Sequence, residues 1–410
     1  MTVSPMSGRA LRAGWAEIDL DAIQHNIRAL RGILTAPARL MVVVKANAYG
    51  HGAVEVARAA ASAGAWGFGV ATVDEGEELR RAGVREPVVL LDLTMPEEAA
   101  RTVALDLAAG VADLDAARAL SRAATSSGRA ARVHLKVDTG MGRAGCAPAD
   151  APAAARAIAH LPGVALEGCY THFPSADDPD LTATREQAAV FSNVLASLRE
   201  AGVGGLLCHA ANSAATLAVP EAHFDLVRCG IAVYGISPAP HLGARVPLRP
   251  VMRLRARLVQ VKRVAAGTAV GYGREYRAGR ETTIATVPLG YADGYPRLAW
   301  RSAAVALAGR RVPIAGRISM DQLTVDAGDL VVRTGDDVEL WGPALPVEEV
   351  AAAAQTIAWE LLVRVAPRVP RVYTSGGAVR SVRTLVAVWD EGAAEGGNRR
   401  ARRLSGRAGR

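Results

Sequence analysis

The sequence predicts an α/β protein with an N-terminal (β/α)8 barrel of the TIM type and a C-terminal, mostly antiparallel β domain. Between about residues 40 and 235, short apolar runs alternate with Ala-rich stretches of helical composition. The runs are continuously apolar, which is typical of parallel strands covered on both faces. Eight such βα units favour a closed barrel over an open, doubly wound sheet. After about residue 248, apolar and polar residues alternate between glycines, as in antiparallel strands and tight turns.

The chain has 410 residues, of which 50% are hydrophobic and 21% are charged. This composition excludes an intrinsically disordered or fibrous protein. No run approaches the ~18 apolar residues of a membrane-spanning helix, and the N-terminus lacks the apolar segment of a secretory signal. We therefore expect a cytoplasmic protein without a membrane partner.

The four cysteines are far apart in the sequence and form neither a CxxC pair nor a metal-ligand pattern. They are Cys146, Cys169, Cys208 and Cys229. A chain of this length does not need disulfides to fold, so we expect reduced thiols and no bound metal.

The net charge of +8 is concentrated at the C-terminus, where residues 398–410 contain six arginines and no acidic residue. These residues leave a net charge of only +2 for the rest of the chain. A nucleic-acid-binding role would therefore depend on this segment alone. We interpret residues 386–410 as a basic, disordered tail and expect no nucleic-acid partner.

The barrel is assigned to residues 1–248, with residues 1–14 either flexible or contributing a strand. Its Ala-rich segments, such as 52–63 and 183–201, have the composition and length of helices. The eight expected strands are the runs 40–44, 66–71, 87–91, 102–105, 132–137, 166–170, 206–209 and 225–228.

The β domain is assigned to residues 249–385. One helical stretch, 347–365, interrupts its alternating pattern. The expected strands lie in the segments 253–264, 282–290, 303–309, 336–342 and 368–373.

The first barrel strand ends in the motif VVVKANAYGHG, residues 42–52. Lys45 follows four apolar residues directly, so we expect its amine at the barrel mouth and partly desolvated, as a Schiff-base lysine requires. Gly50 and Gly52 permit close approach of the backbone beside Tyr49. Taken alone, the segment is also explained by a lysine that simply ends a strand.

Further polar residues follow other predicted strand ends. In (β/α)8 enzymes the catalytic groups lie at the carboxyl ends of the strands, and phosphate commonly binds after strands seven and eight. Taken singly, a histidine there can be an ordinary buried residue, and Ser213 can be a helix N-cap. The residues in these positions are Arg143, His172, His209, Asn212, Ser213, Arg228, Gly230 and Ile231.

Together with the lysine motif, eight segments resemble alanine racemases, which are pyridoxal-phosphate-dependent, and they occur in the order of that family. The resemblance extends from Trp15 to about Tyr373 and covers both predicted domains. The segments are WAEIDLDAI (15–23), KVDTGMGRAG (136–145), YTHF (170–173), HAANSAATL (209–217), VRCGIAVYG (227–235), GYADGYPR (290–297), GRISMDQ (316–322) and RVPRVY (368–373).

The resemblance implies that Lys45 binds pyridoxal 5'-phosphate and also acts as one catalytic base. Arg228 would face the pyridine nitrogen, with His172 and His209 orienting it. An arginine only donates hydrogen bonds, so it should leave that nitrogen unprotonated. The implied phosphate ligands are Tyr49, Asn212, Ser213, Gly230 and Ile231.

The resemblance also implies which residues lie on the opposite face of the substrate and bind its carboxylate. Tyr272 would be the second base; a phenol is protonated near neutral pH, so it needs activation. Arg143 and the backbone of Met320 would bind the substrate carboxylate. Lys136 matches a lysine that can be carbamylated and positions Arg143. The substrate entrance would be lined by Tyr291, Arg317 and Asp321.

Two positions depart from the family pattern. Ser319 stands where many relatives have cysteine, and Pro367 stands where some have a tyrosine that touches the phosphate. The second departure removes one possible phosphate contact.

The leading hypothesis is an alanine racemase that interconverts L- and D-alanine and supplies D-alanine for peptidoglycan. In the family, Tyr272 and Met320 reach the barrel of a neighbouring subunit, which implies a homodimer with shared active sites. The alternatives are a racemase of another amino acid such as serine, a decarboxylase of the same plan, and a non-catalytic barrel that binds the cofactor.

Overall fold

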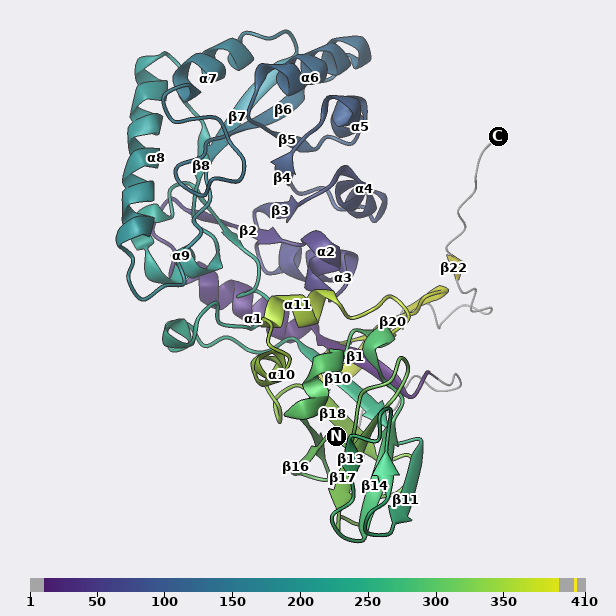
Figure 1. Ribbon diagram of the computed structural model, residues 1–410. Helices are drawn as coiled ribbons and strands as arrows, with labels where there is room; N and C mark the ends of the chain where they lie inside the picture. Colours follow the sequence, from purple (N-terminus) through teal and green to yellow (C-terminus); the bar gives the residue numbers. More distant parts are fainter. Residues whose placement is uncertain (1–10, 391–401, 404–410) are drawn as a thin grey trace. The chain divides into compact units, whose positions relative to one another are not determined.

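The computed structural model describes residues 11–390 and 402–403 of the chain (Figure 1). The chain divides into two compact units. The barrel unit comprises Ala22–Tyr49 and Ala53–Arg249, and the β unit comprises the residues up to Asp21, Gly50–Gly52 and the residues from Pro250 onward.

The barrel unit contains one eight-stranded parallel sheet in the order β8-β7-β6-β5-β4-β3-β2-β9 (Figure 1). Two backbone hydrogen bonds join its ends, from the Asp225 N–H to the Cys208 carbonyl (3.0 Å) and from the Arg228 N–H to the Ala211 carbonyl (2.9 Å). The strands are β2 (Arg39–Val43), β3 (Gly67–Val70), β4 (Val88–Leu93), β5 (Ala108–Val111), β6 (Ala131–Lys136), β7 (Val164–Tyr170), β8 (Leu207–His209) and β9 (Leu226–Cys229).

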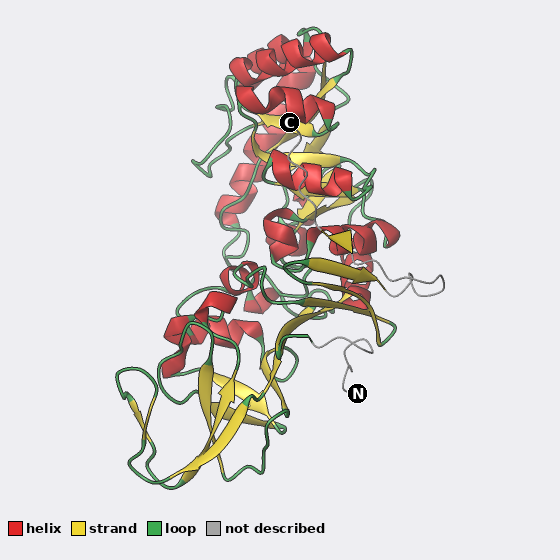
Figure 2. Cartoon of the chain, turned by 90° about the vertical axis from the view of Figure 1, so that its right-hand side faces the viewer, coloured by secondary structure: helices red, strands yellow, loops and turns green. Residues whose placement is uncertain are grey.

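Helices follow the barrel strands and lie outside them (Figure 2). Helix α6 is a typical example: Asp113 caps its N-terminus, and it ends at Gly128, whose φ of 66° suits a left-handed C-cap. Strands β3 and β5 are buried along their whole length, because helices and barrel interior cover both faces. The helices are α1 (Leu20–Arg31), α3 (Ala53–Ser62), α4 (Val73–Arg81), α5 (Ala99–Ala104), α6 (Leu114–Ser127), α7 (Ala151–Ala159), α8 (Thr182–Glu200) and α9 (Ser213–Ala218).

The predicted fold class is confirmed, but the fourth predicted strand is wrong. Residues 102–105 belong to α5 and the residue after it, where Thr102 and Val103 are buried and the Thr102 hydroxyl donates to the Glu98 carbonyl. The strand is β5, whose sequence AAGV contains a single β-branched residue. Such small residues are depleted or neutral in strands, so its β signal is weak.

The β unit is mostly antiparallel, with one parallel pair, β1 with β19. Its largest sheet has the order β16-β15-β18-β10-β1-β19-β20-β21-β22, and a second sheet has the order β11-β14-β17. The strands are β1 (Gly14–Asp19), β10 (Met252–Arg257), β11 (Gln260–Val264), β12 (Ala269–Val270), β13 (Tyr276–Arg277), β14 (Thr282–Val287), β15 (Ala304–Leu307), β16 (Arg310–Pro313), β17 (Leu323–Gly328), β18 (Asp337–Trp341), β19 (Arg371–Ser375), β20 (Ala378–Arg383), β21 (Ala387–Asp390) and β22 (Arg402–Arg403).

Three expected elements differ in the structure. The expected barrel, residues 1–248, includes the residues of β1, but β1 pairs with β10 and β19 and so belongs to the sheet of the β unit. The segment 253–264 forms two strands, β10 and β11, which belong to different sheets. The helical stretch 347–365 is two helices, α10 (Val347–Ala353) and α11 (Ala358–Val363), separated by Gln355 in a left-handed conformation.

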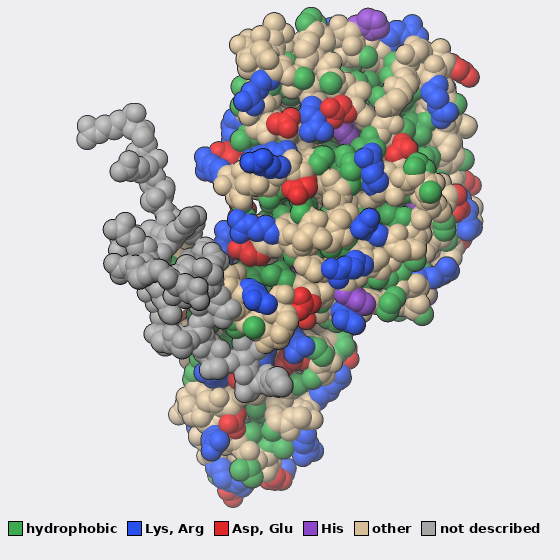
Figure 3. Space-filling view, turned by 180° about the vertical axis from the view of Figure 1, so that it is seen from behind, with side chains coloured by type: hydrophobic (Ala, Val, Ile, Leu, Met, Phe, Trp, Pro, Cys, Tyr) green, Lys and Arg blue, Asp and Glu red, His purple; other side chains and the backbone are tan. Residues whose placement is uncertain are grey.

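Most of the expected tail, 386–410, and most of the expected N-terminal extension, 1–14, lie outside the described residues. The described part of the tail includes β21, which pairs with β20 and shows that ordered structure extends past residue 386. Within residues 11–390, basic and acidic side chains are interspersed over the barrel face shown in Figure 3. Among the described residues, no helix combines the length and apolar character needed to cross a membrane.

Candidate active site

A left-handed turn places Lys45 at the carboxyl end of β2. Residues Ala46, Asn47, Ala48 and Tyr49 have φ values of 52–54°. For residues with a Cβ, this conformation costs about 1–2 kcal/mol each. The chain thus turns sharply after Lys45, whose side chain is half-buried, at the end of the barrel where the sequence predicts it.

Arg228, in β9, is the central cation of this end of the barrel. It is only 4% exposed, and its guanidinium donates to the carbonyls of Thr171 (2.7 Å) and Ala210 (2.9 Å). It also contacts Nδ1 of His209 (3.0 Å) and Nδ1 of His172 (3.1 Å). Within residues 11–390, none of the ion pairs involves Arg228. This guanidinium is therefore buried against neutral acceptors.

These contacts define the protonation of the neighbouring histidines. Because a guanidinium only donates, Nδ1 of His209 and of His172 must accept. Nε2 of His209 then has the hydrogen and donates to Nδ1 of His134 at 2.9 Å. Burial, reinforced by nearby arginine charges, lowers the pKa of His134 and of His172 to about 3. Burial lowers the pKa of Arg228 to about 10, so at pH 7 one cation lies among neutral imidazoles.

Lys136 adds a second buried cation beside this group. Its Nζ donates to the Leu91 carbonyl (3.2 Å) and lies 5.4 Å from the centre of the Tyr170 ring. Burial lowers the pKa of Lys136; the charge of Asp92 opposes that shift, whereas the charges of Arg143, Arg228 and Lys45 add to it. The four cations are thus close enough to repel one another, and the site favours an anionic ligand.

Two residues of this group, His134 and Tyr170, were missed by the sequence analysis. The Tyr170 ring stacks on His209 with 4.9 Å between centroids, and its hydroxyl donates to the Leu91 carbonyl at 2.9 Å. His134 precedes Lys136 by two residues, so both side chains lie on one face of β6. That spacing was the available signal for His134.

Ser213 and Gly230 lie together beside Tyr49. The Ser213 hydroxyl oxygen accepts the N–H groups of Gly230 (3.0 Å) and Ala232 (3.4 Å). A Cβ at Gly230 would lie 2.4 Å from the Tyr49 hydroxyl, so only glycine leaves room for that contact. Ile231 is buried between these backbone groups. Four of the five predicted phosphate ligands are thus brought together in the barrel unit.

The fifth, Asn212, uses both polar atoms of its side chain within the protein. Its Oδ1 accepts the Ala215 N–H (3.0 Å) and caps α9, and its Nδ2 donates to the Phe173 carbonyl (3.1 Å). The N-cap is therefore Asn212 and not Ser213, which leaves the serine hydroxyl to the cluster around Gly230.

Arg143 is exposed on the loop after β6, and Asp138 shapes that loop. One carboxylate oxygen of Asp138 accepts the N–H groups of Gly140, Met141 and Gly142 at 2.9–3.1 Å. Burial alone would raise the pKa of Asp138, but these backbone donors lower it overall. The turn holds the backbone just before Arg143.

The predicted residues of the β unit form a separate group. Tyr272 makes an isolated antiparallel bridge with Arg317, whose guanidinium pairs with Glu275. The Tyr291 N–H donates to the Ser319 carbonyl (3.1 Å), and the next N–H donates to the Met320 carbonyl (2.9 Å). The loops that contain these residues are therefore joined through their backbones.

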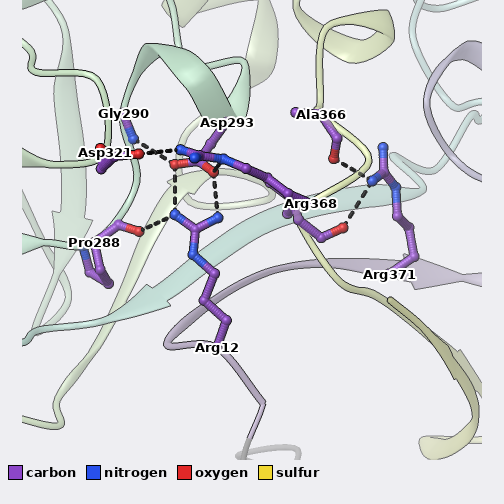
Figure 4. Close-up of polar contacts among 9 residues, drawn as sticks. Arg12, Pro288, Gly290, Asp293, Asp321, Ala366, Arg368 and Arg371 are labelled. Carbon is purple, nitrogen blue, oxygen red and sulfur yellow. Dashed lines mark hydrogen bonds and ion pairs between the residues drawn. The ribbon is translucent and has the colours of Figure 1, made fainter. Parts of the chain in front are cut away.

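Asp293 connects this group to the rest of the β unit (Figure 4). Its fully buried carboxylate accepts from Arg12, from Nε of Arg368 (2.7 Å) and from the Gly290 N–H (3.0 Å). Arg368 also donates to Asp321 at 2.6 Å. Burial would raise the pKa of Asp293, but the hydrogen bonds from Arg12, Arg368 and Gly290 lower it overall.

A parallel barrel with a lysine and a buried arginine at its carboxyl end, joined to a β unit with polar loops, defines a two-domain barrel enzyme. Comparisons identify the family. The model "Alanine racemase, N-terminal domain" matches residues 18–238, and "Alanine racemase, C-terminal domain" matches residues 251–373. The chain belongs to the alanine racemase family.

Individual relatives agree with this assignment. The chain is 46% identical over 368 residues to the alanine racemase of Symbiobacterium thermophilum, covering 88% of this chain and 97% of the relative. The alanine racemase of D-cycloserine-producing Streptomyces lavendulae superposes with a TM-score of 0.86 at 45% identity. The match covers 90% of this chain and 98% of that one. The alanine racemase of Clostridium difficile 630 superposes with a TM-score of 0.88 at 34% identity, and the match covers 92% of this chain and 100% of that one.

The Asp293 network predicts an acid-sensitive contribution to stability. Because the folded pKa of Asp293 lies below its ordinary value, this contribution is complete above about pH 4 and is lost as the pH falls through the folded pKa. Asp293→Asn should lower the free energy of unfolding at pH 7 by about 2–3 kcal/mol, since two arginines lose a buried partner. Urea titrations at pH 7 and at lower pH measure this.

The matched control is Asp329→Asn, which removes an exposed ion pair with Arg280. It should change the free energy of unfolding by less than about 1 kcal/mol. Equal losses in the two variants at pH 7 would contradict the role given to Asp293.

Proposed function

We propose that the protein interconverts L- and D-alanine with pyridoxal 5'-phosphate, using Lys45 and Tyr272 as two bases. The main support is Arg228, a buried cation whose acceptors are carbonyls and neutral imidazoles and which has no carboxylate partner among the described ion pairs. Membership of the alanine racemase family supports alanine as the substrate.

The barrel residues fit a phosphate-bearing aromatic aldehyde. Lys45 would bind it covalently through its amine, and Tyr49, Ser213 and the backbone of Gly230 would receive the phosphate. The positive charges of Lys136, Arg143 and Arg228 favour an anionic ligand at this end of the barrel. When bound, the cofactor makes the Cα–H of the attached amino acid more acidic.

In this proposal Arg228 limits how acidic the Cα–H of the attached amino acid becomes. Its guanidinium donates and, with a pKa of about 10, remains protonated at neutral pH. Arg228 would face the ring nitrogen of the cofactor and, because it only donates, would leave that nitrogen unprotonated and the ring a weaker electron acceptor. The residues around it then favour prompt return of a proton to Cα over transfer of the amino group.

Racemisation requires one proton to leave Cα on one face and another to return on the opposite face. In our proposal the Lys45 amine and the Tyr272 hydroxyl serve these two faces. Arg143 and the backbone N–H of Met320 orient the substrate carboxylate. Lys136 positions Arg143, and its buried amine is suited to carbamylation because burial favours the neutral form.

Exposed side chains of the β unit support a homodimer. Tyr272, Met320 and Tyr291 are 69%, 53% and 42% exposed. Apolar and aromatic side chains grouped on one surface are typical of an interface. We propose that this surface completes the barrel site of a second copy, which gives two shared sites in each dimer.

In the cell, we propose that the enzyme supplies D-alanine for peptidoglycan in the cytoplasm. All four cysteines are free thiols, which agrees with a reducing compartment. A serine racemase would use the same machinery with a different side-chain pocket, and a decarboxylase would release carbon dioxide. Incubating each amino acid with the protein and measuring the two enantiomers and carbon dioxide distinguishes these activities.

The two-base assignment predicts different defects in two variants. Lys45→Ala should lose the yellow chromophore that borohydride reduces onto the chain, because the covalent link is gone. Tyr272→Phe should keep the chromophore but lose about 10²–10⁴-fold in the L-to-D direction, since one base is missing. Absorbance spectra and enantiomer ratios measure both effects.

Tyr276→Phe is the control for the second variant. Tyr276 lies four residues further along, and its hydroxyl donates to Asp326 (2.5 Å), within the β unit. The Tyr276→Phe variant should racemise alanine nearly as fast as the unmodified enzyme. Wild-type rates for Tyr272→Phe in both directions, or a covalent chromophore in Lys45→Ala, would refute the assignment.

The shared sites predict complementation between inactive subunits. In a mixed dimer of Lys45→Ala and Tyr272→Phe chains, one site combines both defects and the other has neither. Random mixing should therefore restore about one quarter of wild-type activity. Activity is measured after the two variants are dissociated, mixed and reassociated.

If each site were built within one subunit, mixing would restore nothing. Full activity of a verified monomer would also contradict the dimer proposal. The unmixed variants, treated in the same way, are the controls.

A further inference from the structure

We propose that Glu75 is a positioning residue that fixes the left-handed turn after Lys45 and thereby the place of the lysine amine. The inference rests on the proposed function, because Lys45 is assigned as the cofactor lysine there. It identifies a role for a side chain outside the predicted site, at the start of helix α4.

The turn needs an external restraint. Four consecutive residues with side chains, 46–49, have left-handed backbone conformations, each of which is unfavourable for an L-amino acid. Such a conformation persists only where surrounding contacts impose it. The distal half of the turn has such contacts: the Ala48 N–H donates to the Val44 carbonyl (2.7 Å), and Asn47 Oδ1 accepts the Ala53 N–H (3.0 Å).

Glu75 restrains the proximal half. Its Oε1 accepts the N–H of Ala46, the residue after Lys45, at 2.6 Å. Its Oε2 accepts the N–H groups of Ala71 (2.8 Å) and Thr72 (3.3 Å). One carboxylate therefore joins the turn after β2 to the segment that links β3 and α4.

Glu75 is itself held in place. It is the N3 residue of a capping box in α4, in which the Thr72 hydroxyl accepts the Glu75 N–H (3.3 Å). The next residue, Gly76, packs so closely that a Cβ there would lie 2.7 Å from Leu107. A capping box needs only one bond from the glutamate to the N-cap backbone. The additional bond to Ala46 is thus not required by the helix.

The turn also connects to the predicted phosphate ligands. Tyr49 is its last residue, and the centroids of the Tyr49 and Tyr234 rings are 4.8 Å apart. Burial raises the pKa of Tyr234, and the nearby Tyr49 and Glu75 raise it further. The Tyr234 hydroxyl donates to the Val43 carbonyl (2.8 Å), at the end of β2. A change in the turn would therefore displace the lysine and the phosphate-binding tyrosine together.

The decisive experiment compares Glu75→Gln with the double variant Glu75→Gln/Ala46→Gly. A glutamine amide nitrogen cannot accept a hydrogen bond, so the side chain can bind the Ala46 N–H or the N–H groups of Ala71 and Thr72, but it no longer joins the two segments. Glu75→Gln should weaken pyridoxal-phosphate binding and lower kcat, each by about tenfold or more, with a smaller change in KM for alanine. Hydrogen exchange at the Ala46 amide of the cofactor-free protein should accelerate.

Ala46→Gly should rescue part of both losses, because glycine adopts the left-handed conformation without steric cost. A residue that only stabilised α4 would not be rescued by a change in a different segment. Asp74→Asn is the matched control: it alters the neighbouring residue of α4, which is exposed and paired with Arg101. It should leave cofactor binding, kcat and Ala46 exchange unchanged.

Three results would overturn the inference: wild-type cofactor binding and kcat in Glu75→Gln, unchanged exchange at Ala46, or no rescue by Ala46→Gly. Thermal unfolding of all variants separates loss of folding from loss of position. If the unmodified protein bound no pyridoxal phosphate through Lys45, the proposed function would fail, while the exchange measurement would still report on Glu75 and the turn.

Discussion

The burial of the Arg228 guanidinium is the interaction around which the end of the barrel is organised. A buried charge is costly unless its donors are satisfied, and here the acceptors come from the segments after β7 and β8 as well as from side chains. These bonds fix three neighbouring βα segments relative to one another. The residues that surround the barrel mouth therefore depend on the same cation that is proposed to control the cofactor.

The histidines extend this arrangement without adding charge. Since His209 accepts from the guanidinium on one nitrogen and donates to His134 with the other, its tautomer is determined by the protein. The neutral imidazoles orient the Arg228 guanidinium but do not neutralise its positive charge. The surplus positive charge remains available to an anionic ligand, and burial together with this surplus lowers the pKa of the Lys136 amine.

Much of the architecture could be predicted because buried parallel strands are continuously apolar and because motif residues follow their ends. The prediction failed for β5, whose small residues have little strand preference, and for β1, whose partners are remote in the sequence. Lys45 and Arg228 lie in recognisable motifs. His134, Tyr170 and Glu75 were missed because they act on other residues, and only the folded chain places them in contact.

The position of β1 has a consequence for how the protein is made. This strand is synthesised before the barrel unit, yet it pairs with β10 and with β19, which both follow the barrel unit in the sequence. Contacts of such high sequence separation form late and slow folding. The barrel unit can assemble while translation continues, whereas the main sheet of the β unit cannot close until β19 has emerged.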